Sequence, residues 1–210
     1  MESVLKNLRT QIVVVGIGLF FAKPVAALTL DSHLRIQESY VAESQGKKAL
    51  AIERMIQIYK GEPNDYFVNL RLGWLFYSNG KYKNAEDHYS RAAGITPTSV
   101  EPLLGLSLTL VTEENWTQVL QTCEELLKRD PNNYLGQQRK IQAYLKLNRF
   151  SEAAQTASEV LKMYPTDAVF LEQRGYALQQ QEKTEEARSV LTFLLAISPK
   201  NEYARSILGK

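Results

Sequence analysis

Five prolines recur along this chain at a constant interval of 34 residues. They are Pro63, Pro97, Pro131, Pro165 and Pro199. Proline has no backbone N–H and disfavours helical backbone in the residue before it, so each of them marks the end of a helix. Short polar residues that favour turns and helix N-caps follow every proline. A fixed period of this length predicts helix–turn–helix units that stack, because one unit cannot bury its apolar face alone.

The interval divides most of the chain into units of equal length. The units are residues 32–65, 66–99, 100–133, 134–167 and 168–201, and a short cap over residues 202–210 follows them. Such arrays need a terminal cap, and Ile207 and Leu208 are available to cover the last unit. Helix-breaking residues are scarce inside the predicted helices, and no strand-like alternation is present. The predicted fold class is all-α, and the repeat domain spans residues 28–210.

The second unit resembles the tetratricopeptide repeat family. The family pattern of Leu-Gly, an aromatic residue, Ala, a second aromatic residue, Ala and Pro is present as Leu72-Gly73, Phe76, Ala85, Tyr89, Ala92 and Pro97. Asn69 stands where the pattern has Trp, which is a departure. The other units carry parts of the pattern, and the third is the loosest. The resemblance implies a right-handed α-solenoid of about five units with a short C-terminal capping helix.

The first 27 residues have a different character. Lys6 and Arg9 precede an apolar run over residues 12–22, and small residues follow it as far as Ala27. This layout predicts a secretory signal peptide cleaved after Ala27, and therefore an exported, periplasmic protein. The run is shorter than the ~20 apolar residues that span a bilayer comfortably. The alternative is an uncleaved membrane anchor over residues 10–22, and the N-terminus of the mature protein distinguishes the two.

The charge balance argues against nucleic acid as a partner. The whole chain has 25 basic and 23 acidic residues. Without residues 1–27, which contain Lys6, Arg9, Lys23 and Glu2, 22 of each kind remain. Nucleic-acid binding needs clustered Lys and Arg, which a neutral repeat domain does not provide. The predicted partners are proteins or peptide segments, a homo-oligomer is an open possibility, and membrane contact is expected only through an uncleaved N-terminus.

The residue types that carry chemistry are sparse and scattered. His33 and His88 lie in different units without a partner at metal-ligand spacing, and both are expected at the surface. Acidic pairs such as Glu113-Glu114 are expected to be solvated charges. Cys123 is the only cysteine, cannot form an intrachain disulfide, and is expected to be a small core residue. The sequence therefore predicts no catalytic, metal or cofactor site, and no enzyme.

The family resemblance implies a concave groove lined by the first helix of each unit, with positions 2, 5, 9, 12 and 13 of the unit pointing inward. These positions are mainly aromatic and aliphatic in units one to three, and mainly amide or mixed polar in units four and five. The residues predicted to bind a partner are Tyr40, Phe67, Leu70, Trp74, Tyr77, Leu104, Leu108, Val111, Gln138, Gln142, Tyr176 and Gln179. Exposed aromatic clusters tend to be interaction surfaces. The alternative is that some of the apolar members pack in the core.

The same positions bear on one known function of the family. The family's chaperone adaptors hold a C-terminal carboxylate with Lys and Asn side chains. Those positions hold Ile36 and Tyr40, Leu70 and Trp74, and Leu104 and Leu108 here. A cytosolic chaperone adaptor of that kind is therefore not expected.

The predicted function is a non-enzymatic scaffold that binds partner segments in the groove and assists the assembly of an envelope or surface complex. The assembly role rests on family analogy. One alternative is a structural protein that self-assembles through its ends. Another is a membrane-anchored accessory subunit of an export or biosynthesis complex.

Overall fold

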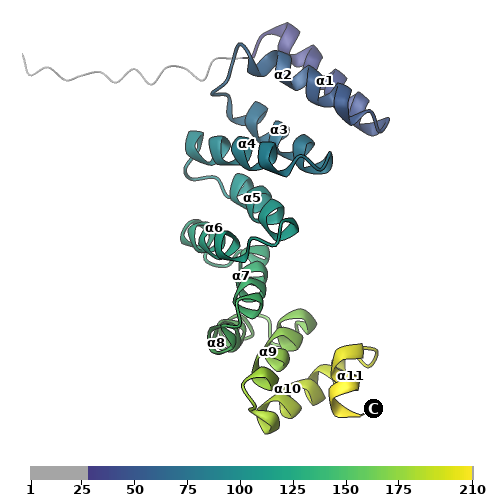
Figure 1. Ribbon diagram of the computed structural model, residues 1–210, viewed down its shortest axis with the longest axis vertical. Helices are drawn as coiled ribbons and strands as arrows, with labels where there is room; N and C mark the ends of the chain where they lie inside the picture. Colours follow the sequence, from purple (N-terminus) through teal and green to yellow (C-terminus); the bar gives the residue numbers. More distant parts are fainter. Residues whose placement is uncertain (1–27, 210) are drawn as a thin grey trace, which may run out of the picture.

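The computed structural model describes residues 28–209, and within that range it contains eleven α-helices and no β-strand. The helices form one elongated column from α1 to α11 (Figure 1). They are α1 (Leu30–Ser44), α2 (Lys48–Tyr59), α3 (Tyr66–Ser78), α4 (Tyr82–Ile95), α5 (Glu101–Thr112), α6 (Trp116–Arg129), α7 (Tyr134–Lys146), α8 (Phe150–Val160), α9 (Ala168–Gln180), α10 (Thr184–Ile197) and α11 (Glu202–Leu208). The predicted all-α class is confirmed.

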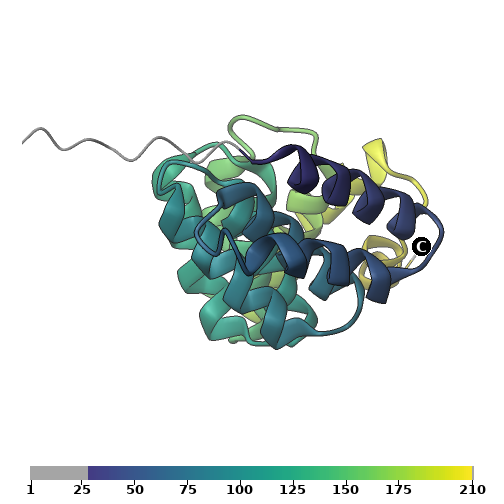
Figure 2. The ribbon, with the colours of Figure 1, turned by 90° about the horizontal axis from the view of Figure 1, so that it is seen from above.

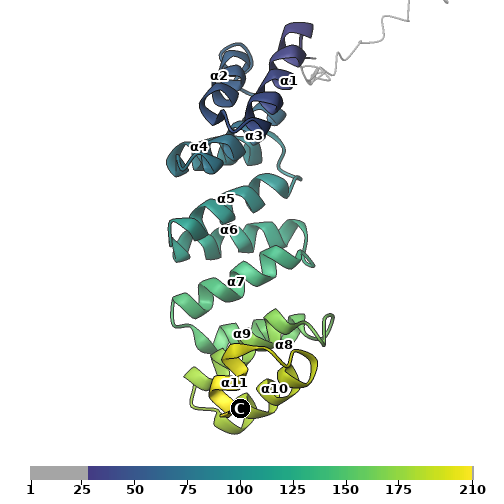
Figure 3. The ribbon, with the colours of Figure 1, turned by 90° about the vertical axis from the view of Figure 1, so that its right-hand side faces the viewer.

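Each helix packs against the next one along the chain, so every unit is a helical hairpin. The first helices of neighbouring units also touch, since α3 contacts α5, α5 contacts α7, and α7 contacts α9. In Figure 1 this row lies to the right of α4, α6 and α8, and both ends of the column reach further right. The hairpins are stacked along the long axis (Figure 3) and turned relative to one another about it (Figure 2). The row of first helices therefore follows the inner side of a curved array.

A residue in the left-handed region links the two helices of every unit. These residues recur every 34 positions and are Gly46, Gly80, Glu114, Asn148 and Glu182, with φ between 55° and 74°. Glycine adopts this conformation without steric cost, and Asn tolerates it better than most residues. The same backbone turn is thus kept in two units whose side chain, Glu, does not favour it.

Side-chain caps begin most of the first helices. Asp65, Asn133, Asp167 and Asn201 each accept a backbone N–H from the first turn that follows. Each lies two residues after a proline of the 34-residue series, which explains the polar residues seen there. The third unit differs, because α5 has no side-chain cap and carries Pro102 in its first turn.

The first helix begins earlier than the unit boundary at residue 32 predicts. Thr29 caps α1, and its hydroxyl accepts the N–H of Ser32 at 3.1 Å. Leu30 is therefore the first helical residue. The Thr hydroxyl supplies an N-cap that the proline interval does not mark.

The core consists of two clusters that meet at α5. One cluster fills the first two units, and the other runs from the third unit to α11, while Leu106 packs against both. The Tyr89 ring occupies the junction between Gly73 and Gly105, where a Cβ atom would come within 2.6 Å and 2.3 Å of it. Cys123 is fully buried, and burial raises the pKa of its thiol to about 12. The predicted core role of this cysteine is confirmed.

The short helix α11 covers the end of the array. Its Ala204 is fully buried, and Tyr203, Ile207 and Leu208 pack against the core from one side. The predicted C-terminal capping helix is therefore present. The predicted signal peptide or anchor over residues 1–27 lies outside the described residues, among which no helix is long and apolar enough to cross a membrane.

His88 corrects one prediction, because it is buried and not at the surface. Its ring stacks on Phe76 at 5.4 Å between centroids and meets the edge of Tyr59 at 5.0 Å. Its Nδ1 lies 3.0 Å from Oδ1 of Asn69, which is also fully buried. Burial, aided by Arg91, lowers the pKa of His88. His33 is exposed, as predicted.

The departure from the family pattern at Asn69 explains this burial. The Nδ2 group of Asn69 donates to the backbone carbonyls of Pro63 at 2.9 Å and Asp65 at 2.8 Å. Its Oδ1 then remains for His88. A buried polar group is tolerated when it is hydrogen-bonded, so the pair Asn69–His88 replaces an apolar contact with a satisfied polar one.

Candidate functional site

The predicted groove residues lie on α1, α3, α5, α7 and α9, and none of them is fully buried. Tyr40, Trp74 and Tyr176 are exposed, and the other nine are half-buried. The indole of Trp74 is 43% exposed, which does not fit a core role. Tyr77, like Phe67 and Leu70, packs one side against the core and leaves another accessible. The row of first helices thus presents a continuous, partly apolar surface.

Trp74 is held in a defined orientation on this surface. Its Nε1–H donates to Oε1 of Glu43 at 2.6 Å, which connects α3 to α1. Its ring lies 6.0 Å from that of Tyr77, and the Tyr77 hydroxyl lies 3.3 Å from the hydroxyl of Thr112 on α5. The two aromatic rings therefore bridge three neighbouring first helices.

The carboxylate of Glu43 also neutralises Arg71, which is only 7% exposed. Oε2 of Glu43 lies 2.6 Å from Nη2 of Arg71 in an ion pair without a well-aligned hydrogen bond. The Arg71 guanidinium lies 3.8 Å from the centroid of the Tyr40 ring, a cation–π geometry. Burial acts to raise the pKa of Glu43, but the Trp74 and Arg71 donors outweigh it and lower that pKa. The cluster of Tyr40, Glu43, Arg71 and Trp74 is preformed and has no net charge.

Further along the row, side chains also donate hydrogen bonds to the backbone of the neighbouring first helix. Nη1 of Arg139 on α7 donates to the Leu104 carbonyl and to the Ser107 hydroxyl of α5, both at 2.7 Å. Burial lowers the pKa of Arg139. Nε2 of Gln173 on α9 donates to the Gln138 carbonyl of α7 at 3.4 Å. These bonds consume two backbone carbonyls of the predicted groove and hold its first helices together.

Several amide groups in the same half remain available. The side chains of Gln138 and Gln142 make no hydrogen bond to any residue that the structure describes. Oε1 of Gln179 also lacks a donor among the described residues, but it is buried and therefore not accessible to a bound segment. The unpaired amides of Gln138 and Gln142 can bond to the backbone of a bound segment.

The sequence prediction missed Arg71 and Arg139 because neither occupies one of the inward positions taken from the family. Both stand at position 6 of their units, as Gln173 does in the fifth unit. The long polar side chains at position 6 of these units were the sequence signal that could have indicated contacts between neighbouring units. Gly105 fills that position in the third unit and leaves room for Tyr89.

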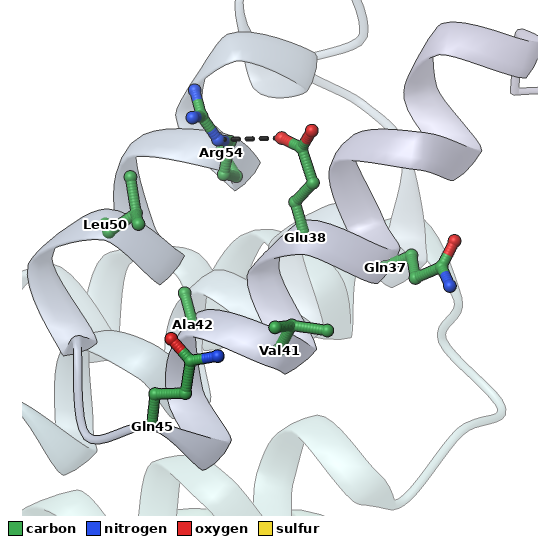
Figure 4. Close-up of a pocket in the computed structure, with 7 residues that line it drawn as sticks. All are labelled: Gln37, Glu38, Val41, Ala42, Gln45, Leu50 and Arg54. Carbon is green, nitrogen blue, oxygen red and sulfur yellow. Dashed lines mark ion pairs between the residues drawn. The ribbon is translucent and has the colours of Figure 1, made fainter.

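Three cavities of the structure lie away from the predicted groove residues. A cavity of about 280 Å³ between α1 and α2 contains an ion pair of 2.8 Å between Arg54 and Glu38 (Figure 4). One of about 370 Å³ lies near α8–α10, and one of about 530 Å³ lies between the end of α10 and α11. None of the twelve groove residues lines any of the three. The predicted groove residues therefore lie outside these three cavities.

The titratable groups of the structure suggest no catalytic centre. The described residues contain no group of three or more side chains that could hold a metal ion. The pKa of Glu113 is raised by burial and by the neighbouring carboxyl of Glu86, so this acid pairs across two units and not with Glu114. No nucleophile accompanies that pair, because the one cysteine is buried with a raised pKa.

Comparisons with known sequences agree with the geometry. Two family models described as tetratricopeptide repeat match residues 37–100 and 110–171. A curated relative, the Hsp70/Hsp90 co-chaperone cns1 of Schizosaccharomyces pombe, is 27% identical over 118 residues. That stretch is 54% of this chain but 33% of the co-chaperone, so the chain spans about a third of that relative.

Solved structures show the same fold at low identity. A MamA fragment from Desulfovibrio magneticus RS-1 superposes with a TM-score of 0.74 at 13% identity, covering 84% of this chain and 99% of the fragment. A tetratricopeptide repeat protein from Parabacteroides merdae superposes with a TM-score of 0.77 at 17% identity, covering 87% of this chain and 75% of that protein. YrrB, a tetratricopeptide repeat protein described as having an unusual peptide-binding site, superposes with a TM-score of 0.73 at 16% identity. The match covers 84% of this chain and 91% of YrrB.

Proposed function

Because this chain is a tetratricopeptide repeat protein, a non-enzymatic scaffold for protein–protein interaction, we propose that the row α1, α3, α5, α7 and α9 binds a segment of a partner protein. The observation that carries this proposal is the Trp74 cluster. Its rings are accessible, and Glu43 and Arg71 fix their orientation before any partner arrives. Preorganised aromatic residues are favoured as interface anchors because little conformational entropy is lost on binding.

The two halves of the row suggest how the segment would lie. Apolar side chains of the partner would pack on the aromatic surface of α1, α3 and α5, around Trp74 and Tyr77. The amides of Gln138 and Gln142 on α7 would bond to its backbone. The partner that this surface fits is an amphipathic helix or extended strip with an apolar edge and little charge.

We also propose a cellular location and a biological role for this protein. The signal-like residues 1–27 support export to the periplasm, and a role in assembling an envelope or surface complex would follow. If residues 1–27 stay uncleaved, the alternative function is that of a membrane-anchored accessory subunit of an export or biosynthesis complex. The likeness to a co-chaperone does not transfer its partners, because Lys and Asn are missing from the positions that hold a carboxylate in the family's adaptors.

Photocrosslinking tests the groove directly. We expect a photoreactive residue at position 74 to capture a protein partner in intact cells, and one at position 95 on α4 to capture none. The double variant Trp74→Ala, Tyr77→Ala should lose that partner and remain folded, with a loss of about 1–3 kcal/mol in the free energy of unfolding because the two rings also bridge neighbouring first helices. The control Ile95→Ala also removes an exposed apolar side chain and should keep the partner. Full capture by the double variant would refute the groove.

Self-assembly through the ends is a second candidate, favoured by α1. Leu30, Leu34 and Val41 expose 79%, 52% and 49% of their surface on this helix. A second copy could cover them. Sedimentation of the purified protein tests this, since one mass at all concentrations would exclude self-assembly.

A further inference from the structure

We propose that the cavity between α8, α9 and α10 is a second binding site, for an acidic side chain flanked by an apolar one on a protein partner. The cavity measures about 370 Å³, which is within the usual size of ligand pockets. Its residues come from the end of α8 and the loop after it, from α9, and from α10. Leu171 and Arg174, its two residues on α9, stand at positions 4 and 7 of the unit, outside the inward positions of the groove.

The charges that line this cavity are unbalanced. Arg174 and Lys162 are both present, and no Asp or Glu is among the lining residues. Arg174 makes no hydrogen bond or ion pair with any other residue between 28 and 209, and its Nε is buried without an acceptor. A buried donor without an acceptor is unfavourable, and a carboxylate is the acceptor that best fits a guanidinium. The protein itself supplies no carboxylate to Arg174 in this cavity, so a partner could supply one.

The first unit shows what a satisfied version of the same place looks like. Glu38 and Arg54 stand at positions 7 and 23 of that unit and form an ion pair of 2.8 Å in the cavity drawn in Figure 4. The same two positions of the fifth unit hold Arg174 and Val190. Arg174 thus stands at the position of the acid Glu38, and no carboxylate stands at the position of Arg54 to pair with it. The fifth unit differs from the first by lacking an intramolecular acid at this place.

The apolar part of the ligand follows from Phe193. This ring is 44% exposed on α10, at position 26 of its unit. The four other units carry Gln57, Arg91, Glu125 and Glu159 there, all of them polar. Leu161, Leu171 and Val190 line the cavity with it. An aromatic or aliphatic side chain next to the acid would cover Phe193, which is otherwise an exposed large hydrophobic residue.

A terminally blocked peptide with adjacent Phe and Asp residues is a suitable probe, and its Phe-Asn counterpart is the matched control. In titrations of the ¹⁵N-labelled protein, we expect saturable shifts at the amides of α8–α10 with the Phe-Asp peptide, and at least tenfold weaker binding of the Phe-Asn peptide. Arg174→Gln should weaken binding at least tenfold. Arg188→Gln, which changes an exposed arginine of α10 that does not line the cavity, should leave it unchanged. No saturable shift, or equal binding of both peptides, would overturn the proposal.

Val190→Glu provides a test that does not remove any cation. The new carboxylate would pair with Arg174 as Glu38 pairs with Arg54, so the peptide should lose its site while the urea midpoint does not fall. Unchanged peptide binding in this folded variant would contradict the proposal. Phenyl phosphate tests whether the site prefers a phosphate to a carboxylate. If phenyl phosphate bound more tightly than the Phe-Asp peptide, the proposal of a carboxylate ligand would be overturned. The variant Trp74→Ala, Tyr77→Ala should bind the peptide normally, which separates this site from the groove.

Discussion

The two halves of this array share one backbone repeat, but different sets of side chains join their first helices. Between α1 and α5, aromatic rings and the Glu43–Arg71 ion pair connect neighbouring first helices. Between α5 and α9, Arg139 and Gln173 donate to backbone carbonyls, and an aromatic contact between Tyr134 and Phe170, with ring centroids 5.0 Å apart, also joins α7 to α9. The first half displays the rings of Tyr40 and Trp74 to solvent, and the second half presents the half-buried amides of Gln138 and Gln142 together with the exposed ring of Tyr176. The surface of the first half is therefore the more aromatic of the two.

The close contacts of glycine show the same contrast. In the first half, Gly73 and Gly105 both face the rigid ring of Tyr89, which is only 4% exposed. In the second half, a Cβ on Gly136 would lie 2.7 Å from the end of the Leu126 side chain. A methyl group of Leu can move by rotation, whereas a ring held on both faces cannot. The first half should therefore tolerate added volume less well.

Gly105→Ala and Gly136→Ala test this difference and should give the largest effect. We expect Gly105→Ala to lower the free energy of unfolding by about 1–3 kcal/mol, as overpacking of a filled core does. Gly136→Ala should change it by less than about 1 kcal/mol, because the higher helix propensity of Ala offsets a small adjustment of Leu126. Urea unfolding monitored by circular dichroism measures both. Equal losses would show that the halves are packed alike.

Asn69→Ala and Gln142→Ala sharpen the comparison for polar groups. Removing Asn69 leaves the buried ring nitrogen of His88 without a partner, so we expect a loss of about 1–2 kcal/mol. Gln142 is half-buried and makes no hydrogen bond with the described residues, so its loss should cost under about 0.5 kcal/mol. The same urea titration applies. A harmless Asn69→Ala would mean that the pair contributes no stability.

Acidification should weaken the first half through His88. Because burial lowers the pKa of this histidine in the folded protein, the unfolded chain binds the proton more readily. Stability should therefore fall as the pH drops from about 7.5 through the unfolded value of about 6.5. His88→Gln should show a smaller fall between pH 7.5 and 5.5 than the parent protein, measured from urea midpoints. Identical pH profiles would exclude this effect.

The smallest expected effect concerns a feature that the halves share. Glu114 and Glu182 adopt φ of 55° and 61°, which glycine adopts without strain. Changing either to Gly should raise the free energy of unfolding by about 0.5 kcal/mol, since the relief of strain exceeds the added chain entropy only slightly. Asn148→Gly should gain less, because Asn tolerates this conformation. A much larger gain at one Glu than at the other would show that the turns are not equivalent.

The register of the repeats could be predicted because proline and cap residues act locally. The prolines placed the turns, and the positions counted from them placed Cys123 in the core. His88 could not be assigned in this way, since its burial depends on Asn69, 19 residues earlier and on another helix. The start of α1 at Leu30, two residues before the first unit, could not be read from the prolines because the Thr29 cap sets it.

The groove illustrates the same limit. The family register identified surface positions on the first helices, but it gave no reason to consider Arg71. The role of this arginine depends on Tyr40 and Glu43, which belong to the unit before it. Contacts between units depend on two residues at once, and a pattern that treats each unit separately does not contain them. Comparing position 6 of one unit with positions 9 and 12 of the previous unit would have revealed the ion pair.

The internal neutralisation of Glu43 by Arg71 has a consequence for how the protein responds to salt. A surface without net charge releases no counterions when a neutral segment binds, so affinity at the Trp74 cluster should hardly change between low and physiological ionic strength. An acid bound to Arg174 would instead be screened and would dissociate as salt rises. The ionic strength of the surroundings would then determine whether the protein holds one partner or two.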